Sequence, residues 1–189
     1  VAIDHQSLKR EDFAATLSNR GLLLARNNDL DAALRDHDRA IETAPEIPSL
    51  YVNRANTYTR AQRLDAARSD LDRAIALVEE RAAVAAPNVS GAAETSAATA
   101  DAAAGEEAEP SAAQVPLADA SAVLGAAFFN RALIEQREGN LDAALADATR
   151  ARDLVADRPM YAEYVQDLER LRAERTPPAA AEEPARAEG

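Results

Sequence analysis

Apolar and small residues recur at spacings of three and four along most of this 189-residue chain. That spacing sets an apolar stripe along one side of an α-helix, whereas a half-buried strand would alternate apolar and polar residues. The helical stretches come in pairs separated by short polar turns. At the first turn the Asn27-Asn28 pair breaks one helix and Asp29 can cap the next, which presents Leu34 and Ile41 on one face. The pattern therefore predicts an all-α protein made of helical hairpins.

The hairpin repeats with a period of 34 residues. Each copy has an Asn-Arg pair followed by a small residue in its first helix, and a Leu-Asp-Ala-Ala run at the start of its second helix. The first signature stands at residues 19–21, 53–55 and 130–132, and the second at residues 30–33, 64–67 and 141–144. The third copy follows the second by 77 residues, which is one period plus 43 residues. A fixed period of this length is typical of proteins in which each unit buries its apolar face against the next.

Small residues mark the contact between the two helices of each hairpin, where a side chain larger than alanine would push the helix axes apart. The second turn, Gln62-Arg63, neither stops a helix well nor caps the next, whereas the third turn has Gly139 and Asn140. We therefore expect the second turn to be the least stable. The residues predicted to pack across the hairpins are Gly21 against Ala33, Ala55 against Ala67, and Ala132 against Ala144.

These features resemble the tetratricopeptide-repeat family, in a bacterial type with three repeats. The resemblance rests on the period, the helix–turn–helix unit, a bulky residue followed by a small one, and the closing proline Pro45. The third unit departs from the pattern at Glu135, where the others have Leu24 and Tyr58. The resemblance implies a right-handed superhelical solenoid closed by a C-terminal capping helix. The predicted organisation is a lead-in at 1–12, units 1 and 2 at 13–78, an inserted segment at 79–120, unit 3 at 121–159, the capping helix at 160–175 and a tail at 176–189.

Composition changes this picture only in the inserted segment and the tail. The net charge is −12, and these two segments carry −9 of it, so the repeat units are nearly neutral. Residues 79–120 hold eight acids, one arginine and no aromatic residue. Such a segment buries too little apolar surface to offset the entropy cost of ordering. We predict that 79–120 and 176–189 are disordered, and that unit 3 stacks on unit 2 across the inserted segment.

Several classes of function are disfavoured by the residues present. The chain has no cysteine, no apolar run near the roughly 20 residues that cross a bilayer, and no basic cluster of the kind that binds nucleic acid. His5 and His37 are the only imidazoles, and we expect His37 to be packed between helices. Asp36 and Asp38 point to two faces of a helix and cannot chelate one ion. We therefore expect no enzyme, no catalytic residue, no metal site, no cofactor, no nucleic-acid partner and no membrane insertion.

Polar residues recur at one place in the first helix of each unit. Stacked hairpins would align three asparagines in a row, and an amide that donates and accepts at once can bind the backbone of an extended peptide. Seven residues after each asparagine stands an arginine, so a second row would favour an acidic segment or a free carboxylate. The resemblance implies that such residues line a concave surface. The predicted peptide-binding groove comprises the asparagines Asn19, Asn53 and Asn130, with Asn56 beside them, and the arginines Arg26, Arg60 and Arg137.

A plainer interpretation stays open, in which the asparagines only tolerate a crowded contact between units and the arginines are solvated. One variant of the family can be tested directly on the residues. The dicarboxylate clamp that holds chaperone C-termini would require other residues at Ser18, Leu22, Ala126 and Asn130, and only Asn53 matches. Chaperone-tail binding of that kind is therefore disfavoured.

A second recurrence joins the two helices of each hairpin. In every unit an arginine is followed after 16 residues by an aspartate, which predicts an ion pair within the hairpin. Removing one partner of a partly buried pair would leave a costly unpaired charge, so we assign this recurrence to stability. The three pairs are Arg20 with Asp36, Arg54 with Asp70, and Arg131 with Asp147.

The sequence thus favours an adaptor that binds an extended segment of a partner protein in the concave groove. The alternative is a structural subunit of a larger assembly, such as one of the cell envelope, packed through its convex face or its ends. An adaptor should be a soluble monomer, whereas an obligate subunit should self-associate when purified alone. A third arrangement, in which the acidic segment occupies the groove itself, is also open. The first residue, Val1, and the resemblance to exported bacterial proteins favour a periplasmic or envelope location over the cytoplasm.

Overall fold

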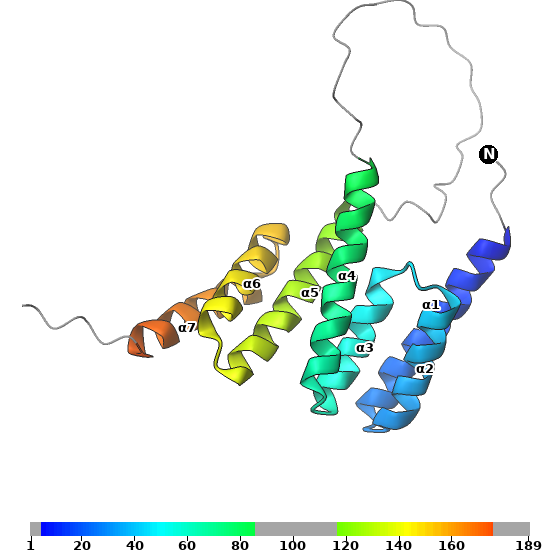
Figure 1. Ribbon diagram of the computed structural model, residues 1–189, viewed down its shortest axis with the longest axis horizontal. Coiled ribbons are helices and arrows are strands. Elements are labelled where there is room, and N and C mark those ends of the chain that lie inside the picture. The colour runs from blue at the N-terminus through cyan, green and yellow to red at the C-terminus, as the bar shows by residue number, and fades with distance from the viewer. Residues whose placement is uncertain (1–4, 86–116, 176–189) are drawn as a thin grey trace, which may run out of the picture.

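The computed structural model describes residues 5–85 and 117–175, and every regular element in these two ranges is an α-helix. The helices follow one another along an elongated array, from α1 at one end to α7 at the other (Figure 1). They are α1 (His5–Arg26), α2 (Leu30–Thr43), α3 (Pro48–Arg60), α4 (Leu64–Ala85), α5 (Leu117–Glu138), α6 (Leu141–Leu154) and α7 (Pro159–Arg175). The all-α solenoid predicted from the repeat is confirmed.

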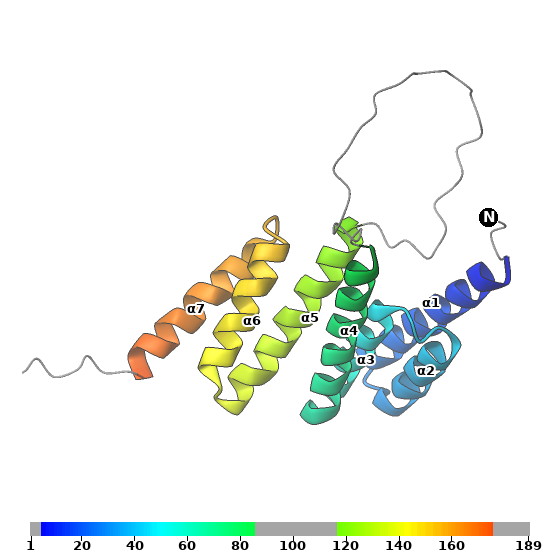
Figure 2. The same ribbon diagram turned by 45° about the horizontal axis from the view of Figure 1, so that its top comes forward.

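The helices pack as three hairpins and a closing helix. α1 packs on α2, α3 on α4 and α5 on α6, and α7 packs on α6 (Figure 2). The second helix of each unit also contacts the first helix of the next. We call the contact of α2 with α3 the first joint, and the contact of α4 with α5 the second joint. The second joint brings unit 3 onto unit 2 although residues 86–116 separate their helices in the sequence.

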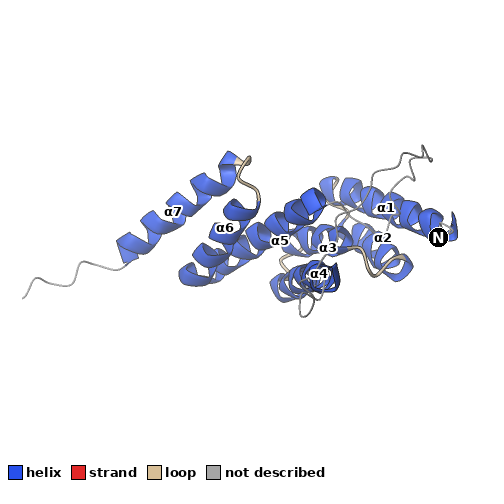
Figure 3. Ribbon diagram, turned by 90° about the horizontal axis from the view of Figure 1, so that it is seen from above, coloured by secondary structure: helices blue, strands red, loops and turns tan. Residues whose placement is uncertain are grey.

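The first helices of the units line the inner side of the array. α1 contacts α3 and α3 contacts α5, whereas in the described residues no comparable contact joins α2 to α4 or α4 to α6. Seen from above, α1, α3 and α5 lie along one side, and α2 and α4 lie along the other (Figure 3). Because helices that approach one another on one side curve an array toward that side, the surface of α1, α3 and α5 is the concave one.

Small residues allow the two helices of each hairpin to approach closely. All six residues predicted at these contacts are buried, and Ala33, Ala55 and Ala67 have no exposed surface. A Cβ atom on Gly21 would lie 2.8 Å from Cε1 of His37 and 3.1 Å from the carbonyl oxygen of Ala33. The first hairpin therefore has no room for even a methyl group at Gly21 unless His37 moves.

The hairpin turns place one residue each in the left-handed region of backbone conformation. These are Asn28 with φ 66°, Gln62 with φ 59° and Gly139 with φ 86°. Glycine adopts this conformation without strain and asparagine at small cost, but a glutamine side chain crowds the following carbonyl. The prediction that the second turn is the least stable thus has a backbone reason.

The caps that follow the turns agree only in part with the sequence. As predicted, Asp29 caps α2, since its Oδ1 accepts a hydrogen bond from the backbone nitrogen of Ala32 at 3.2 Å. The cap predicted at Asn140 is wrong. Its side chain makes no cap hydrogen bond, and its Nδ2 donates instead to Oε2 of Glu135 at 2.8 Å. The acidic side chain of α5 competes for the amide that would otherwise cap α6.

The helices extend past some of the predicted unit boundaries. α1 begins at His5, inside the predicted lead-in 1–12, because no glycine or proline interrupts the helix there. α4 continues to Ala85, since nothing breaks a helix before Pro87, and α5 begins directly after Pro116. Both ends of the segment predicted to be disordered, 79–85 and 117–120, are therefore helical. Its other residues, 86–116, and the tail 176–189 lie outside the described residues.

Candidate peptide-binding surface

The predicted asparagine row lies on the first helices, but two of its members hold neighbouring units together. Nδ2 of Asn53 on α3 donates to Oγ of Ser18 on α1 at 3.0 Å. Nδ2 of Asn130 on α5 donates to Oδ1 of Asn56 on α3 at 2.8 Å. Both donors are half-buried. The plainer interpretation of the sequence, a contact between units, therefore describes part of their role.

The asparagine row has hydrogen-bonding groups that the contacts between units do not use. Asn19 is exposed on α1. An asparagine amide has two N–H donors and an oxygen acceptor, so Asn53 and Asn130 each use only one of these groups in the contacts between units. A peptide on this surface would meet the amide groups of these asparagines that the contacts between units do not use.

The predicted arginine row stands at one edge of the concave side. Arg26, Arg60 and Arg137 occupy the last turns of α1, α3 and α5, and all three are exposed. Within the described part of the chain, none of the three belongs to an ion pair. A cation at a helix C-terminus is favoured by the helix dipole, so these arginines also have a structural reason to be there. Together they make a line of positive charge, one per unit.

Arg137 also borders a shallow pocket between α5 and α7. The pocket has a volume of about 280 Å³ and is lined by Gln136, Arg137, Leu141, Leu171 and Arg175. Two guanidinium groups beside an amide are chemically suited to a carboxylate. Burial raises the pKa of the neighbouring Tyr164 to about 12, and its neutral hydroxyl donates to Oε1 of Gln136 at 2.9 Å.

The predicted arginine–aspartate pairs within the hairpins are confirmed. In each hairpin two N–H groups of the arginine hold both carboxylate oxygens, with distances between 2.6 and 2.8 Å. The three aspartates are buried. The hydrogen bonds from Arg20 hold the pKa of Asp36 below its usual value, and the hydrogen bonds to Asp70 raise the pKa of Arg54. Both charged partners are therefore stable in the fold.

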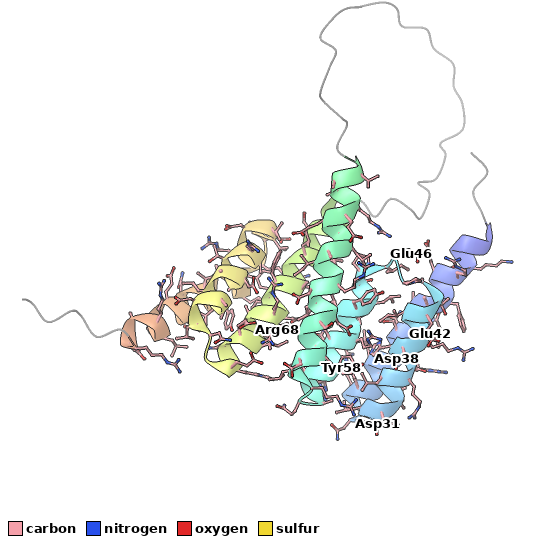
Figure 4. The ribbon with its side chains drawn as sticks, in the orientation of Figure 1. Asp31, Asp38, Glu42, Glu46, Tyr58 and Arg68 are labelled. Atoms are coloured by element: carbon pink, nitrogen blue, oxygen red, sulfur yellow. The ribbon has the colours of Figure 1, made fainter. Side chains whose placement is uncertain are left out.

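The same arginines make a link between units that sequence reasoning missed. Nη1 of Arg54 reaches Oδ1 of Asp38 in the preceding unit at 2.8 Å, and Nη1 of Arg131 reaches Oδ1 of Asp72 at 2.5 Å. Figure 4 shows Asp38 on α2, at the first joint. The signal was the pair of aspartates two residues apart, since one carboxylate turns into its own hairpin and the other toward the next unit. Each of these two arginines therefore joins three helices.

The first joint contains a buried histidine, as expected from the sequence. His37 on α2 is 1% exposed, and its Nε2 lies 3.1 Å from Oγ1 of Thr57 on α3. Its Nδ1 is buried and has no hydrogen-bond partner among the described residues. Burial lowers the pKa of His37, so the imidazole is neutral at pH 7.

The second joint contains ion pairs instead. Nε of Arg68 on α4 donates to Oε1 of Glu135 on α5 at 3.0 Å, and Nη2 of Arg68 pairs with Glu138. Arg68 is labelled on α4 in Figure 4. These contacts account for Glu135, which departs from the repeat pattern. Arg68 is a second departure, because the equivalent residues of the other units are Leu34 and Leu145.

In the ranges that the structure describes, no group of three or more His, Cys, Asp or Glu residues could hold a metal ion. No helix within these ranges is long and apolar enough to cross a membrane.

Comparison with known proteins identifies one repeat unit and the fold. A family model described as tetratricopeptide repeat matches residues 48–78, which form α3 and most of α4. Among solved structures, the first TPR domain of Spaghetti (RPAP3) bound to the HSP90 peptide SRMEEVD has 17% identity and a TM-score of 0.59, covering 86% of this chain and 95% of that chain. No curated protein matches the sequence.

Two further structures have the same fold. The N-terminal domain of stress-induced protein-1 from C. elegans has 17% identity and a TM-score of 0.57, covering 85% of this chain and 97% of that chain. The second TPR domain of human RPAP3, in complex with the HSP70 peptide SGPTIEEVD, has 17% identity and a TM-score of 0.56, covering 85% of this chain and 98% of that chain.

Residues 48–78 match the tetratricopeptide repeat, and the described residues have the fold of tetratricopeptide-repeat domains. The matched residues form the middle hairpin, and the hairpins α1–α2 and α5–α6 have the same helix–turn–helix form. α7 packs on α6 at the place of a capping helix.

Proposed function

We propose that this protein is an adaptor that binds an extended, acidic segment of a partner protein along its concave side. The observation that carries the proposal is the line of exposed arginines at the ends of the first helices, Arg26, Arg60 and Arg137. Arginine forms charge-assisted, often bidentate hydrogen bonds with carboxylates. A segment lying along the array would meet one such group in each unit.

A comparison of the arginines within each unit supports this choice. Arg20, Arg54 and Arg131 are occupied by buried aspartates and therefore serve the fold. The arginines six positions later in each unit are exposed, so their guanidinium groups are available to a ligand. The two RPAP3 domains hold peptides that end in Glu-Glu-Val-Asp, which supports an acidic ligand class. The residues at Ser18, Leu22 and Ala126 favour an acidic sequence other than a chaperone tail.

The test is binding to an array of acidic heptapeptides, each paired with a version in which Gln and Asn replace Glu and Asp. The triple variant Arg26→Gln, Arg60→Gln, Arg137→Gln removes the line of charge. A matched control, Arg35→Gln, Arg73→Gln, Arg170→Gln, removes the same charge from exposed positions on α2, α4 and α7. We expect the first variant to lose acid-dependent binding and the control to keep it. Equal binding by both variants would refute the proposal.

Substitution of the asparagines is a weaker test, since Asn53→Ala and Asn130→Ala also remove hydrogen bonds between units. Asn19→Ala avoids this problem because Asn19 is exposed on α1. If the asparagine row binds peptide backbone, Asn19→Ala lowers the affinity for acidic and neutral peptides alike. The circular dichroism spectrum of the variant should match that of the parent chain.

A structural subunit packed through an end of the array is the second candidate. It is favoured by the exposed apolar side chains of α1, Phe13 and Leu23, which are 45% and 57% exposed. Sedimentation velocity of the purified chain separates the candidates, because an adaptor is monomeric and an obligate subunit associates with itself.

A further inference from the structure

One side of α1 is uncovered although its equivalents in the other units are interior. Leu23 is 57% exposed, whereas Thr57 and Ile134, at the same place in units 2 and 3, are 1% and 0% exposed. Phe13 is 45% exposed, whereas Ile47 and Leu124 are packed against the main core. In units 2 and 3 this side of the first helix faces the second helix of the preceding unit. Unit 1 therefore presents, at the end of the array, a surface of the kind that forms a joint.

The guanidinium of Arg20 on this surface also lacks, within the described residues, one of the two carboxylates that its equivalents hold. In Arg54 and Arg131, one edge of the guanidinium holds the aspartate of the same hairpin and Nη1 holds an aspartate of the preceding unit. In Arg20 the same edge holds Asp36, but within the described residues no carboxylate lies at Nη1. The Arg20 side chain is accordingly 64% exposed, against 20% for Arg54 and 21% for Arg131.

Within the described residues, the pairing of arginine with an aspartate of the preceding unit does not continue to the opposite end of the array. Thr149 stands in unit 3 where Asp38 and Asp72 stand in units 1 and 2, and the place of the arginine is taken on α7 by Val165, which is 3% exposed. The series of shared arginines therefore ends at α7 with an apolar contact. The unmatched guanidinium on α1 is a property of one end only.

We propose that the surface formed by Phe13, Arg20 and Leu23 docks an amphipathic helix of another protein, with an aspartate placed to meet Nη1 of Arg20. The two joints supply the pattern of that helix. In α2 and α4 the aspartate follows a buried residue, His37 or Leu71, and precedes a buried isoleucine by three positions. The partner helix should therefore carry a large buried residue, then Asp, then an aliphatic residue three positions on.

Segments within these 189 residues fit this surface less well. Residues 86–116 contain two valines and no leucine, isoleucine or aromatic residue, so no acid there has the required neighbours. A second copy could offer only α2 or α4, and the residues concerned are already buried in its own joints. A helix from outside these 189 residues is the occupant that the charges and the apolar positions favour.

The test uses a fluorescent, hydrocarbon-stapled peptide with the sequence of residues 64–78 and the full chain as receptor. We expect saturable binding in fluorescence anisotropy. Leu23→Gln should weaken it at least about tenfold, as the loss of one buried leucine side chain implies. The matched control is Met160→Gln, which changes a 51% exposed side chain on α7. Because both residues are exposed, neither change should alter the thermal unfolding of the chain.

The aspartate is tested on the peptide, since Arg20 also supports Asp36 within the fold. A peptide with Asn at the position of Asp72 should bind more weakly, and one with Arg there should not bind. The variant that lacks Arg26, Arg60 and Arg137 should bind the stapled peptide normally, so this proposal can fail or hold independently of the concave surface. Absence of binding, or equal binding by Leu23→Gln, overturns it. Self-association that Leu23→Gln abolishes, without peptide binding, assigns the surface to a second copy and also overturns it.

Discussion

The two joints of the array both pack one unit on the next, but they use different side chains to do so. Both are crossed by an arginine shared among three helices, Arg54 at the first joint and Arg131 at the second. Beside this common bridge the first joint has a buried imidazole against a hydroxyl, and the second has a buried isoleucine with a cluster of exposed and half-buried charges. A repeat thus conserves one contact between units and leaves the rest of the interface free to vary. The difference should appear in how each joint responds to truncation, salt and pH.

Truncating the side chains at two equivalent positions, Thr57 in the first joint and Ile134 in the second, should give the largest difference in stability between the joints. Ile134→Ala removes a fully buried aliphatic side chain from the second joint and should lower the free energy of unfolding by about 2–5 kcal/mol. Thr57→Ala at the first joint removes less apolar volume but leaves Nε2 of His37 without its partner, at a cost of about 1–2 kcal/mol. Urea unfolding of both variants measures the difference. A larger loss from Thr57→Ala would contradict the assignment of Ile134 to the interior.

The charged cluster of the second joint is the next largest contribution. Arg68→Ala leaves Glu135, whose side chain is 13% exposed, without its cation, and should cost about 1–3 kcal/mol. The double variant Arg68→Leu, Glu135→Tyr places there the residues found in unit 1 and unit 2, and should restore most of that loss. Unfolding measured at low and high salt distinguishes the variants, because only the parent joint contains these ion pairs. Equal salt dependence of the parent and the double variant would contradict this interpretation.

Acid should weaken the first joint by a smaller amount. Because burial lowers the pKa of His37 below the value of about 6.5 that it has when unfolded, the unfolded chain takes up a proton first. The stability from the neutral imidazole is complete above about pH 6.5 and declines as the pH falls toward the folded pKa. His37→Leu, which places there the residue of unit 2, should remove this dependence. Unfolding curves between pH 7 and pH 5 test it, and an unchanged slope in the variant would refute it.

The smallest expected effect is that of a substitution at Gln62, in the turn between α3 and α4 that connects the two joints. Gln62 has φ 59°, so Gln62→Gly should relieve strain and raise the free energy of unfolding by about 0.5 kcal/mol. Gly139→Ala in the third turn, with φ 86°, should lower it by about 1–2 kcal/mol. Thermal unfolding of the two variants should therefore shift in opposite directions. Shifts of the same sign would show that these turns are not strained as described.

The sequence predicted the contacts that repeat and missed those that do not. The spacing of 16 residues between Arg20 and Asp36 recurs in every unit, and the bond is present in every unit. The pair of Arg68 with Glu135 joins residues 67 positions apart, each a departure from the repeat, so no periodicity could find it. The available signal was that Arg68 and Glu135 both depart from the repeat pattern and carry opposite charges.

The helices that carry the candidate residues could be predicted, but the contacts that these residues make could not. The row of Asn19, Asn53 and Asn130 lies on the first helices, as the repeat implies, but its alignment brings the amides close enough to bond to neighbouring helices. Whether an aligned polar group faces a ligand or a neighbour depends on how closely the helices approach. That approach is set by the packing of neighbouring units, which brings α1 against α3 and α3 against α5, and not by the polar residue itself.

The second joint has a topological consequence. Within the described residues, the arginine bridge from Arg131 to Asp72 and Asp147, with the apolar packing around it, connects α1–α4 to α5–α7 through side-chain contacts, since residues 86–116 separate the two parts along the backbone. Cleavage of the backbone within that segment would remove no described contact. The described residues therefore form two parts, α1–α4 and α5–α7, whose contact does not depend on the backbone that joins them. Produced separately, they have the interface required for fragment complementation, with the arginine bridge as its recognition element.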